Sequence, residues 1–544
     1  MYNIVARLGL VAMLLAAGCG SSKPVRDAGA SGGATGSGGS TDGGLGGAGG
    51  ADGSAADAPV DSAPSGLTVV RTFVFHELTA LNPGAALGTV ISADGGTVAF
   101  VQNGYNPNHI FAMKFDGTGL TEVDSFNSNC ACQARVDISG NGTGIVSSDS
   151  VTLRYVNASG AGKTTLLTLA SGEISDFRIT ADGTKVFFIA RRDTMTTGAT
   201  PMALPRGVWV INPDGTGLKQ VASAEVIAPM FNVTPDKIFP FSICGISLDV
   251  SNDGARVAFG VGVGGVGDEI LGAGGDGTGV HKIADAGAAQ QVHISGDGSK
   301  VAYVGMMPGA ALTLNAIGFD GAGGKTIGDA STTPFGDGCG KPSRLSGDGS
   351  QYFMSDAGLL FATDGSGALA LAPNDFTGDW LVAGAIYGGS MSDDGTRFVF
   401  LNGDAGGQAQ IISMQMGATA PALGAAPAIS GVDMTPPLLI VGGNRGMSLI
   451  TAKVSAMGTL RLAIANFLKG GLRDPKIGYA TMNDEARDGD LAAGDSVFST
   501  NQAAAGSDAP GGSHNLRVRV ESTVGGKRHA TVIEVTGVSV NFLI

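Results

Sequence analysis

The sequence contains a ten-residue segment that recurs seven times between residues 91 and 400. In each copy an apolar residue is followed by Ser or Thr, one further residue, Asp or Asn, and Gly, as in Ile294–Tyr303 (ISGDGSKVAY). The Ser and Thr residues stand at positions 92, 139, 180, 251, 295, 346 and 392, so the copies are 47, 41, 71, 44, 51 and 46 residues apart. A period of about 40 to 50 residues indicates an array of small β-units, arranged radially or in a line.

Each copy predicts four short strands. An inner strand ends at the Ser or Thr, and the Asp-Gly pair that follows forms a tight turn. In the first copy the second strand is Val98–Phe100 and the third is His109–Met113. A DGTG turn at Asp116–Gly119 then leads into a fourth strand, Leu120–Val123. Four antiparallel strands per repeat are typical of a propeller blade, so we expect an all-β fold.

This repeat, with its Asp-Gly pair and its DGTG turn, resembles the TolB-type repeat over about residues 67–430. The resemblance implies a β-propeller whose ligands meet the central mouth or the loops around it. It covers the propeller only, since the N-terminal α/β domain of TolB proteins has no counterpart here. Seven copies favour seven blades, with Leu67–Leu78 closing the ring as the outer strand of the last blade. Six blades are the alternative, if the second copy, which has Asn141 in place of Asp, forms none.

The inner strands also predict which side chains line the axial channel. Side chains alternate in direction along a strand, and the position directly before each Ser or Thr is always apolar, which assigns it to the core. The position two before should then point into the channel. In five copies it is charged or a histidine: Asp137, Arg178, Asp249, His293 and Arg344. Two interpretations stay open. These residues form ion pairs between neighbouring blades (Asp137 with Arg178, Arg178 with Asp249, His293 with Arg344), or they form a polar mouth that binds a small ligand, a metal or a peptide.

The composition excludes some classes of partner and gives little support to catalysis. The 544-residue chain has 33 Lys and Arg against 47 Asp and Glu, a formal net charge of −14. Binding to nucleic acid requires clustered positive charge, so we expect no nucleic-acid partner. With only six His and no recognisable Ser–His–Asp arrangement, we expect no catalytic residues and no cofactor apart from calcium, discussed below. A lyase or hydrolase built on the propeller and acting on an extracytoplasmic polymer is the alternative.

The N-terminus predicts export and lipidation. Within residues 1–19, a short apolar run, Leu8–Ala17, follows a positively charged residue, as in a signal sequence, and is too short to span a bilayer. Leu15–Cys19 (LAAGC) resembles the lipobox of bacterial lipoproteins, which implies cleavage before Cys19 and a lipid on its sulfur. We therefore expect a lipid-anchored protein of the cell envelope, with the outer membrane favoured. Residues 20–66, rich in Gly, Ser, Ala and Asp, predict a flexible tether.

The remaining cysteines predict disulfides without fixing their connectivity. Three of them lie seven residues before the Ser of their repeat, where the chain enters an inner strand. Disulfides are the expected state in an oxidising envelope, and a thiolate metal site at the channel mouth is the alternative. The residues concerned are Cys130, Cys132, Cys244 and Cys339.

Residues 436–544 predict a second β domain. The repeat stops near residue 430, and alternating runs such as Leu516–Glu521 (LRVRVE) then fit a β-sandwich. Met482–Phe498 resembles a signature of immunoglobulin-like domains on bacterial surface proteins, with Ala486 and Ser496 where the signature has Gly. The aspartates of this segment would either bind calcium or shape the loop through Asx turns. They are Asp484, Asp488, Asp490 and Asp495.

Together these features predict a monomeric, non-catalytic lipoprotein. Its propeller would bind a protein or a glycan of the envelope or the extracellular space, and the identity of that partner stays open.

Overall fold

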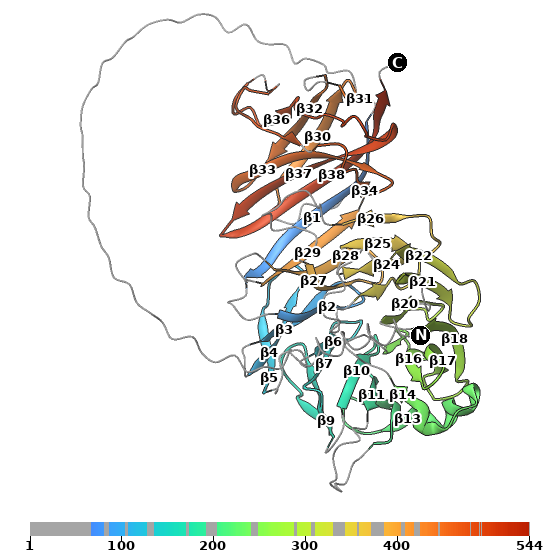
Figure 1. Ribbon diagram of the computed structural model, residues 1–544. Helices are drawn as coiled ribbons and strands as arrows, with labels where there is room; N and C mark the ends of the chain where they lie inside the picture. The colour runs from blue at the N-terminus through green and yellow to red at the C-terminus, as the bar shows by residue number, and fades with distance from the viewer. Residues whose placement is uncertain are drawn as a thin grey trace, which may run out of the picture. The chain divides into compact units, whose positions relative to one another are not determined.

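The computed structural model describes residues 67–80, 86–103, 107–127, 135–169, 173–191, 204–240, 248–287, 291–305, 311–329, 343–355, 358–371, 386–403, 409–417, 425–443, 447–478, 480–488, 490 and 492–542. Most of the regular elements in these ranges are β-strands, which confirms the all-β class (Figure 1). Within the same ranges, no helix has both the length and the apolar character needed to cross a bilayer.

Seven four-stranded antiparallel units follow one another in the described part of residues 68–417. The first three are β2 (Ala86–Ile91), β3 (Thr97–Asn103), β4 (Asn108–Lys114) and β5 (Thr121–Phe126); β6 (Arg135–Ile138), β7 (Gly144–Ser148), β8 (Thr152–Asn157) and β9 (Thr164–Thr168); and β10 (Glu173–Ile179), β11 (Val186–Arg191), β12 (Gly207–Ile211) and β13 (Lys219–Ser223). The next three are β15 (Leu248–Val250), β16 (Arg256–Val263), β17 (Gly267–Gly274) and β18 (His281–Gly287); β19 (Gln291–Ile294), β20 (Lys300–Gly305), β21 (Thr313–Gly318) and β22 (Lys325–Asp329); and β23 (Arg344–Leu345), β24 (Gln351–Met354), β25 (Leu359–Ala362) and β26 (Ala368–Ala370). The last is β27 (Ile386–Met391), β28 (Arg397–Gly403), β29 (Ala409–Gly417) and β1 (Thr68–Ala80). This is the propeller that the repeat predicted.

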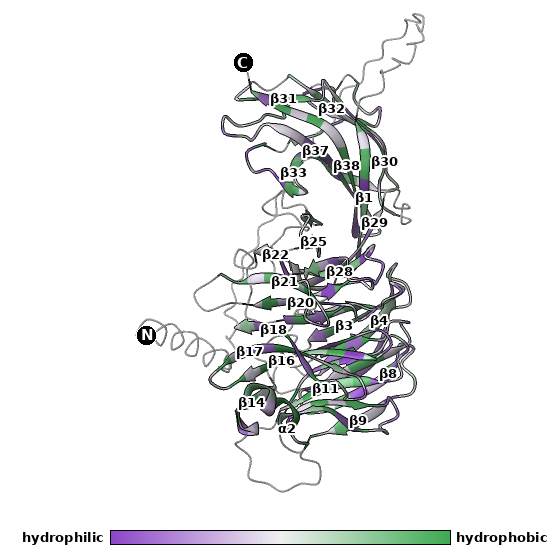
Figure 2. Cartoon of the chain, turned by 90° about the vertical axis from the view of Figure 1, so that its right-hand side faces the viewer, coloured by the Kyte–Doolittle hydropathy of each residue, from purple (hydrophilic) through white to green (hydrophobic). Residues whose placement is uncertain are grey.

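An insertion enlarges the fourth unit. After β13 the chain forms a short helix, α2 (Ala224–Ile227), and two 3₁₀ turns, η2 (Ala228–Phe231) and η3 (Pro235–Lys237). Strand β14 (Ile238–Pro240) then pairs with β16 beside β15. Figure 2 shows α2 next to β14. This segment accounts for part of the 71-residue step in the repeat spacing.

The recurring Ser-x-Asp-Gly sequence is a turn motif. Ser295 Oγ donates to Asp297 Oδ1 (2.6 Å) and accepts from the backbone N–H of Lys300 (3.0 Å). Asp297 Oδ1 also accepts from the backbone N–H of Ser299 (2.8 Å). Gly298 has a φ of 72°, a conformation that glycine adopts without strain. The hydrogen bond from Ser or Thr to Asp or Asn recurs in all seven copies, so the residues that recur in the repeat have a structural role.

Two β-sheets that share one core form the C-terminal part. The larger contains β33 (Thr459–Lys469), β37 (Gly512–Val524) and β38 (Lys527–Phe542), with β34 (Leu472–Arg473) and β35 (Ala480–Thr481) beside β33 and β31 (Leu438–Val441) parallel to β38. The smaller contains β30 (Ala428–Thr435), β32 (Leu449–Ser455) and β36 (Val497–Thr500). Side chains from both sheets, such as Ile450 and Val518, pack into one apolar cluster, as in a β-sandwich. Strand β30 extends this part upstream of the boundary expected at residue 436.

Strand β1 belongs to both parts of the fold. Along one edge it pairs with β29, so the N-terminal strand closes the last propeller unit as predicted; along the other edge it pairs with β38 (Figure 1). The last propeller unit and the larger C-terminal sheet are therefore one continuous ten-stranded sheet. Phe73 and Phe75 of β1 pack with Phe353, Phe398 and Val532, so the propeller and the C-terminal part also share a core.

Two buried histidines lie opposite each other where β1 meets β38. His76 Nδ1 and His529 Nδ1 are 2.6 Å apart, so one ring donates to the other. Burial, together with the neighbouring His529, lowers the pKa of His76 to about 4, while Asp116 acts weakly in the opposite direction. Burial and Lys527 lower the pKa of His529. The hydrogen bond requires an unprotonated acceptor, so both rings favour the neutral form.

We expect this pair to make the fold acid-sensitive. The unfolded chain binds a proton at His76 near pH 6.5, whereas the folded chain resists it down to about pH 4, so stability present above pH 6.5 is lost as the pH falls through this window. At pH 5 the loss should reach about 2 kcal/mol. Urea denaturation of the full chain at pH 7.5 and pH 5 measures it. In His76→Asn the pH dependence should be smaller, whereas the control His109→Gln should keep it. Equal pH dependence in His76→Asn and wild type would contradict this role.

Candidate functional site

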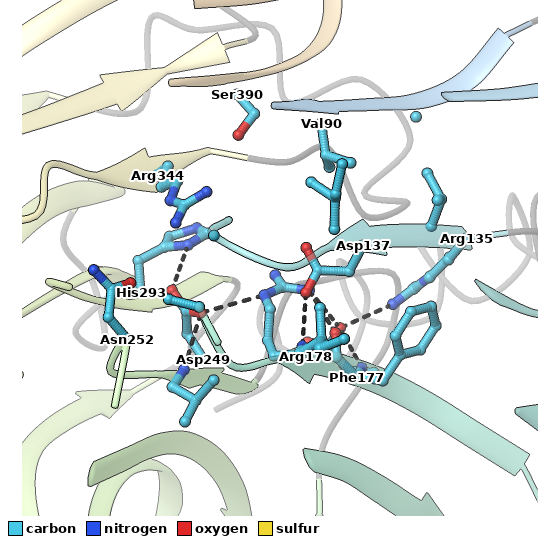
Figure 3. Close-up of a pocket in the computed structure, with 18 of the residues that line it drawn as sticks. Val90, Arg135, Asp137, Phe177, Arg178, Asp249, Asn252, His293, Arg344 and Ser390 are labelled. Carbon is cyan, nitrogen blue, oxygen red and sulfur yellow. Dashed lines mark hydrogen bonds and ion pairs between the residues drawn. The ribbon is translucent and has the colours of Figure 1, made fainter. Parts of the chain in front are cut away.

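The inner strands of the propeller surround a polar cavity of about 80 Å³ (Figure 3). All five residues that the strand alternation assigned to the channel line it: Asp137, Arg178, Asp249, His293 and Arg344. Val90 and Ser390, from the same position in the first and last repeats, also line it. A second layer, four residues before the Ser or Thr, adds Gly88, Arg135 and Asp176. The sequence analysis did not include this layer, although the same alternation extended by two residues points to it.

Three aspartates of the cavity connect neighbouring inner strands. In each case one carboxylate oxygen accepts a backbone N–H from the next unit: Asp137 Oδ2 from Ile179 (2.9 Å), Asp176 Oδ2 from Leu248 (3.0 Å) and Asp249 Oδ2 from Ile294 (3.2 Å). These bonds hold the inner strands β6, β10, β15 and β19 in register around the axis. The aspartates therefore have a structural role in addition to lining the cavity.

Arg178 is held between two of these carboxylates. Its Nε lies 3.3 Å from Asp249 Oδ1, and its Nη1 lies 3.4 Å from Asp176 Oδ1. Burial alone would lower the pKa of Arg178, but Asp176, Asp137 and Asp249 outweigh it and raise the pKa. Burial raises the pKa of Asp249, and the contacts with His293 and Arg178 reverse that shift, so its pKa is lowered. Arg135 Nη1 lies 3.7 Å from Asp176 Oδ1, so two guanidinium groups and two carboxylates form one compact, charge-balanced group.

Two of the three expected ion pairs do not form. Arg178 pairs with Asp249 as expected, but His293 Nδ1 faces Asp249 Oδ2 (3.5 Å) and not Arg344. Arg344 instead lies 3.2 Å from Asp393 Oδ1 and donates to the carbonyl of Ile91 (3.2 Å). Asp393 is the one acidic residue at the third position of the repeat, where the other six copies have Gly, Ala or Asn. This acidic residue is the feature of the sequence that indicates the partner of Arg344. Its carboxylate explains why Arg344 pairs with Asp393 and not with His293.

Asp137 is left without an ion-pair partner in the described part of the chain. The expected pair with Arg178 is absent, and its second oxygen, Oδ1, has no hydrogen-bond donor. Burial raises the pKa of Asp137, against the attraction of Arg178 and Arg344 at longer range. In the same cavity, the fully buried His293 has no partner at Nε2. Burial lowers the pKa of His293, and Asp249 opposes that shift only in part, so the ring is neutral and Nε2 is an acceptor. The cavity therefore offers one carboxylate oxygen, Asp137 Oδ1, without a donor among the described residues, whereas His293 Nε2 is closed off from the cavity.

A ring of backbone hydrogen bonds closes the cavity at the end where the repeat turns lie. The third residue of each copy accepts, through its carbonyl, a backbone N–H from an adjacent copy, and the seven bonds form a complete cycle of 2.7 to 3.0 Å. The residues concerned are Ala93, Gly140, Ala181, Asn252, Gly296, Gly347 and Asp393. The side chains of Asn252 and Asp393, from the fourth and seventh copies, meet across this ring. We call it the floor of the cavity.

The acidic segment of the C-terminal part brings three of its four aspartates together. Carboxylate oxygens of Asp484, Asp490 and Asp495 lie within 4.8 Å of one another. Asp488 is not in this group, and its Oδ1 accepts from Gln502 Nε2 (3.1 Å). Both oxygens of Asp484 accept backbone N–H groups, at 2.7 to 3.2 Å. The aspartates therefore shape the loop, and calcium binding by the three carboxylates stays a prediction.

Two residues of this loop have an unusual backbone conformation. Ala486 and Ser496 have φ values of 54° and 68°, in the left-handed region that glycine favours. The immunoglobulin-like resemblance, whose signature has Gly at both positions, stays a prediction.

The predicted lipidation and disulfide residues, Cys19, Cys130, Cys132, Cys244 and Cys339, lie outside the described residues.

The chain is similar to several solved structures at low sequence identity. No protein-family model and no curated protein sequence matches the chain. The chain is similar to a structure described as TolB from Agrobacterium tumefaciens, at 15% identity over 48% of this chain and 90% of that one, with a TM-score of 0.33. TolB from Acinetobacter baumannii matches at 12% identity over 60% and 64% of the two chains, with a TM-score of 0.34. A puromycin hydrolase matches at 13% identity over 50% and 43%, also with a TM-score of 0.34.

Proposed function

We propose that this protein is a non-catalytic binding protein of the cell envelope, anchored through lipid on Cys19, whose propeller recognises a protein or glycan through the axial cavity. The observation that supports it is the cavity itself. It is lined by charged side chains, closed at one end by the floor, and contains one carboxylate, that of Asp137, without an ion-pair partner among the described residues. Charges that are partly buried in folded proteins are usually paired, so an unpaired carboxylate beside a cavity favours a site for a ligand.

The closed floor defines how a partner would bind. A ligand cannot pass along the axis, because Asn252 and Asp393 meet across the ring. It would approach from the opposite end and insert one polar group between the inner strands, while the rest of the partner stays outside. An apolar cavity of about 150 Å³ admits a benzene molecule, so a cavity of about 80 Å³ takes a narrow group, not a whole sugar ring.

An enzyme is the second candidate, because Asp137 and His293 line one cavity with pKa values shifted in opposite directions. Such a pair can divide acid and base roles. The size of the cavity argues against it, since a polymer could not bring a scissile bond to these side chains.

The experiment uses the purified full chain as bait in chemical cross-linking with envelope extracts, followed by affinity measurement with the purified partner. A stoichiometric complex without chemical change in the partner is the expected result. New reducing ends or unsaturated products from envelope polymers, lost in His293→Gln, would replace this proposal with the enzyme.

A further inference from the structure

The charges around the cavity do not balance, and the imbalance has a definite place. Within the cavity and its immediate ion pairs there are four carboxylates and three guanidinium groups, while His293 is neutral, which leaves one negative charge. The carboxylates belong to Asp137, Asp176, Asp249 and Asp393, and the guanidinium groups to Arg135, Arg178 and Arg344.

The uncompensated charge lies on Asp137. Arg135 pairs with Asp176 (3.7 Å), Arg178 is shared by Asp176 and Asp249, and Arg344 is paired with Asp393. No cationic side chain among the described residues comes within ion-pairing distance of Asp137, and its Oδ1 has no donor. A half-buried carboxylate without a partner is unfavourable, because desolvation is not offset by a nearby cation.

His293 supplies no counter-charge in this cavity. His293 Nδ1 faces Asp249, so the proton of the neutral ring is on Nδ1. The side chain is only 1% exposed, and Nε2 is closed off from the cavity. What this cavity lacks is therefore a positive charge beside Asp137.

The side of the cavity that the first and last repeats form leaves room for a positively charged group. The first and last repeats contribute Gly88, Val90 and Ser390, which are small and uncharged, whereas the other repeats contribute Arg, Asp and His (Figure 3). Phe177 adds an aromatic wall. A guanidinium group is planar and broad, while a primary ammonium is a compact point charge with three donors. The small volume favours the ammonium.

We propose that the axial cavity binds a primary ammonium group, with Asp137 as its counterion. Either a lysine side chain or the amino terminus of a partner has this chemistry. The inference deepens the proposed binding function and rests on it.

The test measures binding of methylammonium to the full chain at pH 7.5 by ligand-observed NMR, with acetamide and acetate as probes of similar size at equal ionic strength. Methylammonium should bind, and the other two should not. Asp137→Asn keeps an oxygen for the N–H of Ile179 and removes the charge, so affinity should fall at least tenfold. Asp364→Asn, at an exposed turn, is the matched control and should bind as wild type does.

Two peptides distinguish the sources of the ammonium. Acetyl-Gly-Lys-Gly-amide offers a lysine side chain only, and Gly-Gly-Gly-amide offers an amino terminus only; the tighter of the two identifies the source. Acetate binding as tightly as methylammonium, or an unchanged affinity in Asp137→Asn, would overturn the inference. If Asp137→Asn is unstable, the discrimination among the three probes on the wild-type chain still decides. Failure here with the partner complex intact would leave the binding function standing.

Discussion

Replacing Arg517 with methionine is expected to lower the free energy of unfolding by about 3 kcal/mol or more, because it leaves a buried carboxylate without its cation. Arg517 Nη2 lies 2.9 Å from Glu534 Oε2, and the two side chains are 2% and 0% exposed. Arg517 also donates to the carbonyl of Ala370 in the propeller (3.1 Å) and lies over the ring of Phe73, 5.0 Å from its centroid. One side chain thus connects the C-terminal sheet, β1 and β26.

The electrostatics of Glu534 support this expectation. Burial would raise its pKa, but Arg517, Asn515 and Arg71 outweigh burial and lower it. Denaturation of the full chain at pH 7.5 measures the effect. Arg71→Met is the control: Arg71 is 32% exposed and 3.6 Å from Glu534, so its loss should lower the unfolding free energy by less than about 1 kcal/mol. Equal and small losses of unfolding free energy in the two variants would show that the buried Arg517–Glu534 pair does not stabilise the contact between the C-terminal sheet and the propeller.

Gly140→Ala is expected to lower the free energy of unfolding by about 3 kcal/mol, because the floor has no room for a methyl group there. A Cβ at Gly140 would lie 2.5 Å from Ala181 Cβ, 2.8 Å from Ala181 Cα and 3.0 Å from Ala93 Cβ. One of these neighbours is backbone, so relief requires two inner strands to separate. That movement would break the closed cycle of hydrogen bonds at this point.

Gly88→Ala is the matched control, one layer above in the same cavity. A Cβ at Gly88 meets nothing within 4 Å, so the melting temperature should stay within a degree or two of the wild-type value. Thermal unfolding of the two variants measures the difference. If Gly140→Ala melts like Gly88→Ala, the floor is not closed as the structure describes.

The repeat made the propeller and much of the cavity predictable. Local turn chemistry fixed the ends of the inner strands, and alternation along a strand then determined which side chains meet at the axis. All five residues derived in this way line the cavity. Of their pairs, Arg178 with Asp249 was predicted, whereas the partner of Arg344 was not, because Asp393 reaches Arg344 from another repeat through the floor. Asp393 is a single position of the repeat, and only the closed ring shows that it lies beside Arg344.

The pairing of β1 with β38, which connects the propeller to the C-terminal sheet, could not be predicted from local sequence patterns. The LRVRVE run alternates like a strand with one solvent-facing side, yet Arg517, Arg519 and Glu521 are buried. Burial of that face depends on β1, which is separated from β38 by more than 400 residues, and a strand's pairing partners leave no local mark on its sequence. The length of β1 and its apolar residues on both faces are consistent with two partners but do not identify them.

The axial cavity is the proposed binding site, and a comparison of two variants at Gly88 tests this proposal most directly. Gly88→Phe would place a ring in the open side of the cavity, whereas Gly88→Ala leaves the cavity open, and neither changes a charge. The measurement is the affinity of each variant for the purified envelope partner. We expect Gly88→Ala to bind as wild type does and Gly88→Phe, folded by its melting curve, to bind at least tenfold more weakly. Equal affinity of the two folded variants would contradict the account and place the partner elsewhere on the chain.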